Sequence, residues 1–189
     1  EQNEILGLSG ELKYHAELNV PNQGDALPKL TVTSDLKGVS YDSPPPLNKS
    51  ALESRDLLLS LLIGPEQMHL NVDLKSAKSP DIKSTMTFVK NEFSSGEVLI
   101  GDVKSKEIDV NGINIVANVE QLELQPWIEF IQANIAKSES TESDLLQRID
   151  LNVDSLDAFG QNFKQTEAVI IKPVDAWQLD LKGESIQGK

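Results

Sequence analysis

Strict alternation between apolar and polar residues limits what this chain can fold into more than any other feature. From residue 6 to residue 20 the even positions are almost all apolar, whereas the odd positions from Ser9 to Asn19 are polar. The apolar positions are Leu6, Leu8, Leu12, Tyr14, Ala16, Leu18 and Val20. Because successive side chains of a β-strand point to opposite faces, this segment predicts a strand with one apolar and one polar face.

The same period returns along the rest of the chain. Turn residues such as Gly, Pro, Asn and Asp separate the repeats, and Asn111-Gly112 is typical of a tight hairpin. The pattern predicts ten to twelve strands, nearly all of them antiparallel. The repeats include residues 67–74, 82–88, 108–119, 149–153 and 177–181.

One segment has a helical period instead. In LQPWIEFIQANIAK (124–137), Trp127, Ile131 and Ile135 recur every four residues. Pro126 stands at an early helical position, where its missing N–H costs nothing. The segment predicts one amphipathic helix near 126–137, laid against the sheet.

The stretch LTVTSDLKGVSYDSPPPLNKS (30–50) changes the parity of its apolar residues at Gly38 and then runs into three prolines. A one-residue slip at glycine is typical of a β-bulge, and proline cannot donate to a ladder. We interpret the stretch as a bent strand followed by an extended connection. Its expected role is architectural.

Composition narrows the possible functions. The formal net charge of −13 disfavours nucleic-acid binding, and there is no cysteine for disulfides or thiolate metal sites. No apolar run reaches the ~20 residues that span a bilayer, so we expect no membrane insertion by this segment. We interpret residues 1–189 as a single β-rich module, and the first residue, Glu1, suggests an excised segment of a longer multi-repeat protein.

Recognisable catalytic or cofactor motifs do not occur. His15 and His69 fall on the polar parity of their strands without a metal-ligand spacing around them. There is no nucleophile elbow, dinucleotide fingerprint or P-loop. We therefore predict a protein that is not an enzyme and holds no cofactor and no metal.

The apolar parity has to be hidden from water, and two arrangements would hide it. In a closed sandwich or barrel it is simply the core. In a twisted and curved open sheet it lines a groove for an acyl chain or another apolar ligand. The fold class predicted is mostly β and antiparallel, with one helix, and either arrangement satisfies the alternation.

Two stretches carry a resemblance to a known family. LTVTSDLKGVSYDSPPPLNKSA resembles a segment of the YhdP-type branch of the AsmA-like superfamily, and DAWQLDLKGESIQGK resembles a tryptophan- and glycine-containing unit that recurs there. The helix start LQPW departs from the aspartate-tryptophan start of that branch through Gln125 and Pro126. With strand order included, the resemblance covers residues 8–189.

The resemblance implies a segment of a periplasmic protein that is tethered to the inner membrane through a part absent from this sequence. Such proteins form a taco-like β-groove and are implicated in conducting phospholipid between the inner and outer membranes. The expected partners are phospholipid or acyl chains and neighbouring segments of the same long chain. The alternative is a closed β-sandwich that serves as a structural or protein-interaction module without a ligand. Parity assigns to the apolar groove Leu12, Tyr14, Leu18, Met68, Leu70, Val72, Trp177, Leu179 and Leu181.

Overall fold

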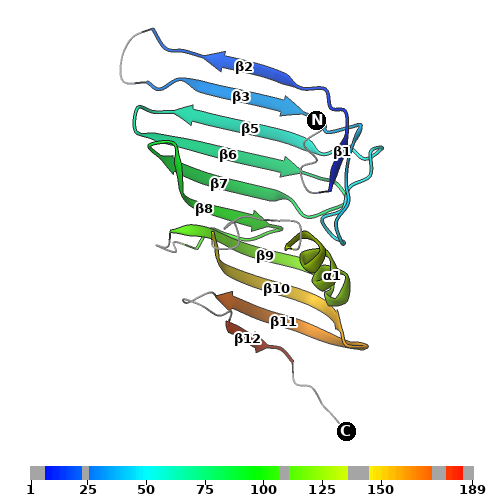
Figure 1. The fold of residues 1–189 in the computed structure, drawn as a ribbon. Coiled ribbons are helices and arrows are strands. Elements are labelled where there is room, and N and C mark those ends of the chain that lie inside the picture. Colours follow the sequence, from blue (N-terminus) through cyan, green and yellow to red (C-terminus); the bar gives the residue numbers. More distant parts are fainter. Residues whose placement is uncertain (1–6, 23–25, 107–110, 136–144, 172–177, 185–189) are drawn as a thin grey trace.

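The computed structural model describes residues 7–22, 26–106, 111–135, 145–171 and 178–184 (Figure 1). Ten of its strands form one large sheet, and two short strands, β1 (Leu8–Gly10) and β4 (Val39–Tyr41), form a second sheet. In spatial order the large sheet contains β12 (Gln178–Lys182), β11 (Gln161–Ile171), β10 (Leu146–Ala158), β9 (Gly112–Glu123), β8 (Glu92–Ile100), β7 (Ile82–Val89), β6 (Gln67–Lys75), β5 (Asp56–Ile63), β3 (Lys29–Ser34) and β2 (His15–Asn19).

This architecture confirms the predicted class, a mostly β fold with one short helix. The sheet is open, so the closed-sandwich alternative does not describe these residues. The predicted helix is α1 (Leu124–Ile135), which begins two residues before Pro126, while residues 136 and 137 lie outside the described part.

Strand pairing is antiparallel except on both sides of β9. The β9 strand runs parallel to β8 and parallel to β10, and α1 connects β9 to β10. The hairpin predicted at Asn111-Gly112 is therefore wrong, because Gly112 begins a strand that pairs with the preceding strand of the sheet in the parallel sense. Residues 108–110, which alternation had placed in a strand, lie outside the described residues.

The parity change at Gly38 marks a change of sheet, and the predicted β-bulge is wrong. The β3 strand ends at Ser34, the backbone turns through Leu36 and Gly38 at positive φ, and β4 then pairs with β1. A side chain at Gly38 would meet the carbonyl oxygen of Glu11, since an ideal Cβ there would lie only 2.4 Å from it. Glycine is needed at this crossing because the two backbones approach so closely.

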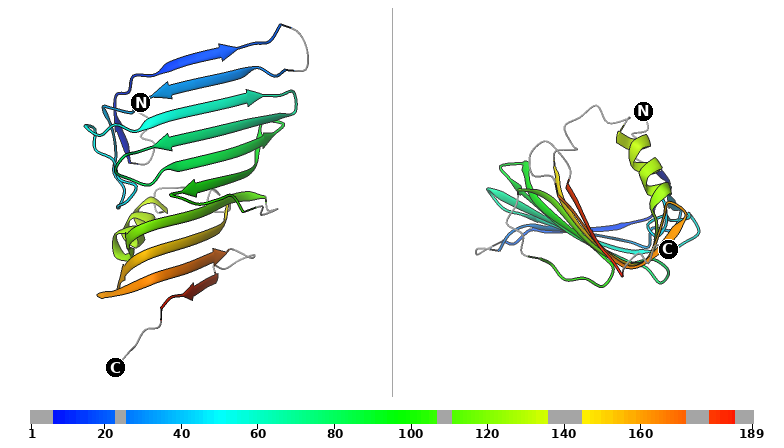
Figure 2. Two further views of the ribbon diagram at one scale, coloured as in Figure 1. Left: turned by 180° about the vertical axis from the view of Figure 1, so that it is seen from behind. Right: turned by 90° about the horizontal axis from the view of Figure 1, so that it is seen from below.

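The sheet curves, and the elements outside it stand on one side of the curve. Seen along the stack of strands, the large sheet forms one arm of a V, while α1 rises on the other side (Figure 2, right). The Trp127 indole N–H donates to the Pro45 carbonyl oxygen at 2.9 Å, so α1 is attached to the proline-containing connection between β4 and β5. The proline segment and the helix thus meet across 82 residues of sequence.

The best-packed region lies at the C-terminal halves of β9 and β10 and at the start of β11. The ladder is interrupted at Asp154, which has no partner on either neighbouring strand, and Gln165 on β11 has a positive φ of 47°. Although Val153 and Leu156 differ in parity, both belong to one buried cluster. Apolar residues from both sides of the interruption therefore join the same core, although they differ in parity.

Two buried cations hold the long connection between β3 and β5 together. Lys49 is 6% exposed, and its Nζ donates to the carbonyl oxygens of Leu36, Val39 and Ser50. Arg55 is 3% exposed and donates to the carbonyl oxygens of Leu47 and Asn48, among other acceptors. These contacts replace the main-chain ladder that three prolines cannot complete.

We expect Lys49→Met to lower the free energy of unfolding by about 2 kcal/mol, because buried carbonyl oxygens would lose a charged donor. Denaturant unfolding followed by circular dichroism measures this change. The matched control is Lys37→Met, an exposed lysine of the same connection, which should change stability by less than about 0.5 kcal/mol. Equal effects of the two substitutions would show that the Nζ contacts do not stabilise the connection.

Candidate functional site

The register of the large sheet places nearly all of its apolar side chains on one side. Residues paired across neighbouring strands share a face, and following the pairs from β2 to β12 gives one continuous apolar surface. We call it the inner face. It comprises Ala16, Leu18, Leu30, Val32, Leu57, Leu59, Leu61, Ile63, Met68, Leu70, Val72, Leu74, Ile82, Met86, Phe88, Phe93, Val98, Ile100, Ile113, Ile115, Ala117, Val119, Ile149, Leu151, Val153, Ala168, Ile170, Leu179 and Leu181.

The inner face lies inside the V. The connection after β8 is attached to the opposite face, because the Lys106 N–H donates to Glu97 at 3.2 Å and its Nζ lies 3.3 Å from Asp150. Figure 2 (right) shows this green connection outside the V, on the side away from α1. The apolar face therefore lies on the same side of the sheet as the helix.

Six of the nine residues that parity assigned to the groove lie on the inner face. Leu12 and Tyr14 precede β2, outside any strand, and both are exposed, Tyr14 by 67%. Trp177 lies outside the described residues. The role of these nine residues in binding a ligand stays a prediction. The six on the inner face are Leu18, Met68, Leu70, Val72, Leu179 and Leu181.

Little covers the inner face. Side chains at the two ends of the sheet are well exposed, Leu18 by 60% and Leu179 by 55%. Even in the middle of the sheet, the inner-face residues of β5 and β6 are only partly buried. An apolar surface that crosses ten strands and stays open in this way is unusual for a soluble monomer, and large patches of this kind are typical of interaction sites.

The β5 strand supplies inner-face residues that parity could not assign. Its sequence DLLLSLLI is apolar on both parities, so alternation does not say which leucines face inward. Pairing with β6 settles the question, because Leu59 lies opposite Val72 and Leu61 opposite Leu70, whereas Leu58 lies opposite Asp73 on the other face. Only the neighbouring strand, with its clear alternation, resolves the ambiguity.

Polar atoms on the inner face are few. Ser84 lies in the row between Val72 and Val98, and its buried hydroxyl has no hydrogen-bond partner. The Thr166 hydroxyl, in the row of Val153, is buried and without a partner as well. Because a hydroxyl can donate or accept, these two buried groups are unsatisfied polar atoms in an otherwise apolar layer.

The opposite, outer face of the sheet carries the charged side chains. Both histidines, His15 and His69, also lie on this face. Its best-defined cluster centres on Asp150, which is 4% exposed and accepts two hydrogen bonds from Arg148, at 2.7 and 2.9 Å. The hydrogen bonds from Arg148, helped by Lys106, lower the pKa of Asp150 although burial opposes the shift. The same hydrogen bonding raises the pKa of Arg148. This cluster fixes the connection after β8 to the outer face.

Within the described residues, no group of three His, Cys, Asp or Glu side chains is arranged to hold a metal ion. Among those same residues, no helix has the length and apolarity needed to cross a membrane.

A family model described as YhdP protein matches residues 2–189, which is nearly the whole chain. No curated protein and no solved structure matches the chain.

The Asp150 cluster predicts a specific pH dependence of stability. Because the pKa of Asp150 is lower in the folded than in the unfolded protein, its contribution is complete above the unfolded value of about 4 and is lost as pH falls below it. We expect Asp150→Asn to lower the free energy of unfolding by about 2 kcal/mol at pH 7 and to lose this effect progressively below about pH 4.

Urea unfolding of both proteins between pH 7 and pH 3 measures the difference. Asp56→Asn, at an exposed aspartate of β5, is the control and should change stability by less than about 0.5 kcal/mol. A deficit in Asp150→Asn that stays constant down to pH 3 would contradict the role given to the carboxylate.

Proposed function

The chain belongs to the YhdP family of AsmA-like envelope proteins, and we propose that this segment shields phospholipid acyl chains on its inner face while they pass between the inner and outer membranes. The role is passive and non-catalytic. It would support lipid homeostasis of the outer membrane.

The observation that carries this proposal is the unbroken apolar surface across ten strands. One row runs from Val32 through Leu59 and Val72 to Ile115 and ends at Leu179, with Ser84 as its polar member. At a strand spacing of about 4.8 Å, ten strands give an apolar path of about 43 Å perpendicular to the strands. That path is longer than a single acyl chain needs, so a chain could move along it without leaving apolar contact.

The energetics favour acyl chains over headgroups. Each methylene removed from water contributes about 0.8 kcal/mol. Between β2 and β8 the inner-face residues include no charged side chain that could pair with a phosphate or an ammonium group. A headgroup would therefore keep its hydration on the open side of the V, because burying an unpaired charge is costly.

The exposed edges of the sheet support an extended assembly. The edge strands β2 and β12 are each paired on one side only and are exposed along their length. We propose that neighbouring segments of the same long chain continue the sheet at these edges, which would extend the apolar path. The proposed location is the periplasm, with a tether to the inner membrane elsewhere in the protein.

The test compares neighbouring residues on opposite faces at the two exposed ends of the sheet. The inner-face variant is Leu18→Asp with Leu179→Asp, and the matched control is Asn19→Asp with Gln178→Asp on the outer face. All four positions are exposed, so these substitutions place charge on one face or the other with little cost in stability.

Native mass spectrometry and lipid extraction follow purification of each protein from Gram-negative bacteria. We expect phospholipid with the wild type and the outer-face control, and about tenfold less with the inner-face variant, equivalent to a loss of about 1.4 kcal/mol in affinity. Melting temperatures confirm that both variants fold. Equal lipid in both variants, or none in the wild type, would contradict acyl-chain binding on the inner face.

A further inference from the structure

A second surface feature lies apart from the open part of the inner face, at the edge of β9. The ladder between β8 and β9 ends at the pair Ile100 and Ala117, yet β9 continues to Glu123. On its other side β9 stays paired with β10 as far as Glu123. Residues 118–123 therefore have a strand neighbour on one side only, over about 20 Å at 3.3 Å per residue.

The unpaired side of this stretch faces a cleft. The Ile113 N–H donates to the Leu145 carbonyl oxygen on the β10 side. Strand alternation then directs the main-chain groups of Asn118 to the other side. The packing agrees, because a Cβ added at Gly101 would lie 2.1 Å from the Asn118 carbonyl oxygen.

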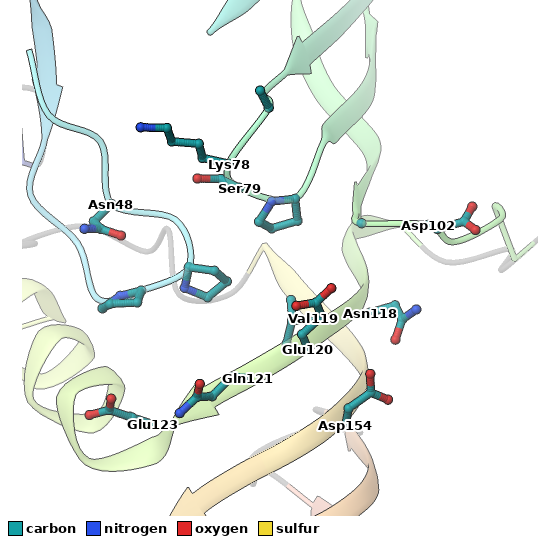
Figure 3. Close-up of a pocket in the computed structure, with 15 residues that line it drawn as sticks. Asn48, Lys78, Ser79, Asp102, Asn118, Val119, Glu120, Gln121, Glu123 and Asp154 are labelled. Atoms are coloured by element: carbon teal, nitrogen blue, oxygen red, sulfur yellow. The ribbon is translucent and has the colours of Figure 1, made fainter. Parts of the chain in front are cut away.

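The cleft has a volume of about 690 Å³, which is in the range of ligand-binding clefts. Its walls are the proline-containing connection at Pro45 and Pro46, the turn between β6 and β7, and the start of the connection after β8. In Figure 3, Glu120 rises from β9 toward the turn that carries Lys78 and Ser79. The Gln121 side-chain amide instead donates to Asp157 of β10 at 3.2 Å. Gly101 lies close to the edge at Asn118, and among the described residues no strand pairs with this side of β9 from Val119 to Glu123.

The charge of the cleft indicates what it accepts. Four carboxylates line it, on Asp102, Glu120, Glu123 and Asp154, against the single ammonium group of Lys78. The carboxylates come from three different segments around the exposed main chain of β9. A bound segment with basic side chains would be attracted, and an acidic one repelled.

We propose that the free edge of β9 is a docking site for an extended, basic peptide segment of a partner protein. The segment adds a short strand beside residues 118–123, with main-chain hydrogen bonds to β9 and lysine or arginine side chains beside the carboxylates. This is strand addition to an exposed sheet edge, in which main-chain bonds give affinity and side chains give specificity. The site does not depend on the proposed lipid function.

The first experiment titrates the wild-type chain with three synthetic hexapeptides, by fluorescence anisotropy. The first alternates lysine and threonine, the second alternates glutamate and threonine, and the third is the lysine peptide with alternate main-chain nitrogens methylated. Methylation removes the donors needed for strand pairing but keeps the charge. We expect the lysine peptide to bind, the glutamate peptide not to bind, and methylation to weaken binding at least about tenfold.

Two triple variants with the same change in net charge locate the site. Glu120→Gln/Glu123→Gln/Asp154→Asn removes three carboxylates of the cleft, and Glu17→Gln/Glu66→Gln/Glu92→Gln removes three exposed carboxylates elsewhere. The first should weaken binding of the lysine peptide about tenfold or more, and the second less than about twofold. Melting curves verify that both fold.

Amide hydrogen exchange then reports where the peptide pairs. Slower exchange within residues 118–123 supports the proposal. Protection confined to the exposed strands β2 or β12, equal binding by the methylated peptide, equal losses in the two triple variants, or absence of binding by the lysine peptide would each overturn it.

Discussion

The register of the ten-stranded ladder is the constraint on which the rest of this structure depends. Main-chain hydrogen bonds fix which residues lie opposite one another, and a slip of one residue would move every apolar side chain of a strand to the other face. The β5 strand shows how strong this constraint is. Its own sequence, apolar on both faces, accepts either register, and the alternating β6 beside it selects one.

An open sheet needs stabilisation from places other than a central core. Among the described residues, the buried apolar cluster is confined to the C-terminal halves of β9 and β10 and the start of β11, on both sides of the ladder interruption at Asp154. Elsewhere, buried polar groups perform this role. Lys49 and Arg55 bind the carbonyl oxygens of the connection between β3 and β5, and Asp150 holds the connection after β8. These groups secure the described parts of the connections without covering the inner face.

The parallel strand β9 links the two surfaces that we interpret as functional. Because it is parallel to both neighbours, each of its connections crosses a face of the sheet. Lys106 lies on the outer face, and α1 stands on the inner side, attached through Trp127 to Pro45. The β9 strand also extends beyond its ladder with β8. Its C-terminal end is therefore unpaired on that side, beside the proline-containing connection. The acidic cleft is thus a consequence of one parallel strand in an otherwise antiparallel sheet, and the same strand brings α1 to the inner side.

The sequence by itself determined the class of fold, the parity of the clear strands, the helix and the family resemblance. Alternation placed Leu18, Leu70 and Leu179 on one face because side-chain direction in a strand depends only on position. It failed at Gly38 and at Asn111-Gly112, where local turn chemistry allowed a bulge and a hairpin, and the chain instead changed sheet and began a parallel strand. Only the tertiary structure decided that the sheet is open, which leucines of β5 face inward, and that β9 has a free edge. These features depend on contacts between residues far apart in the chain, and a local pattern carries no information about which distant strand will be its neighbour.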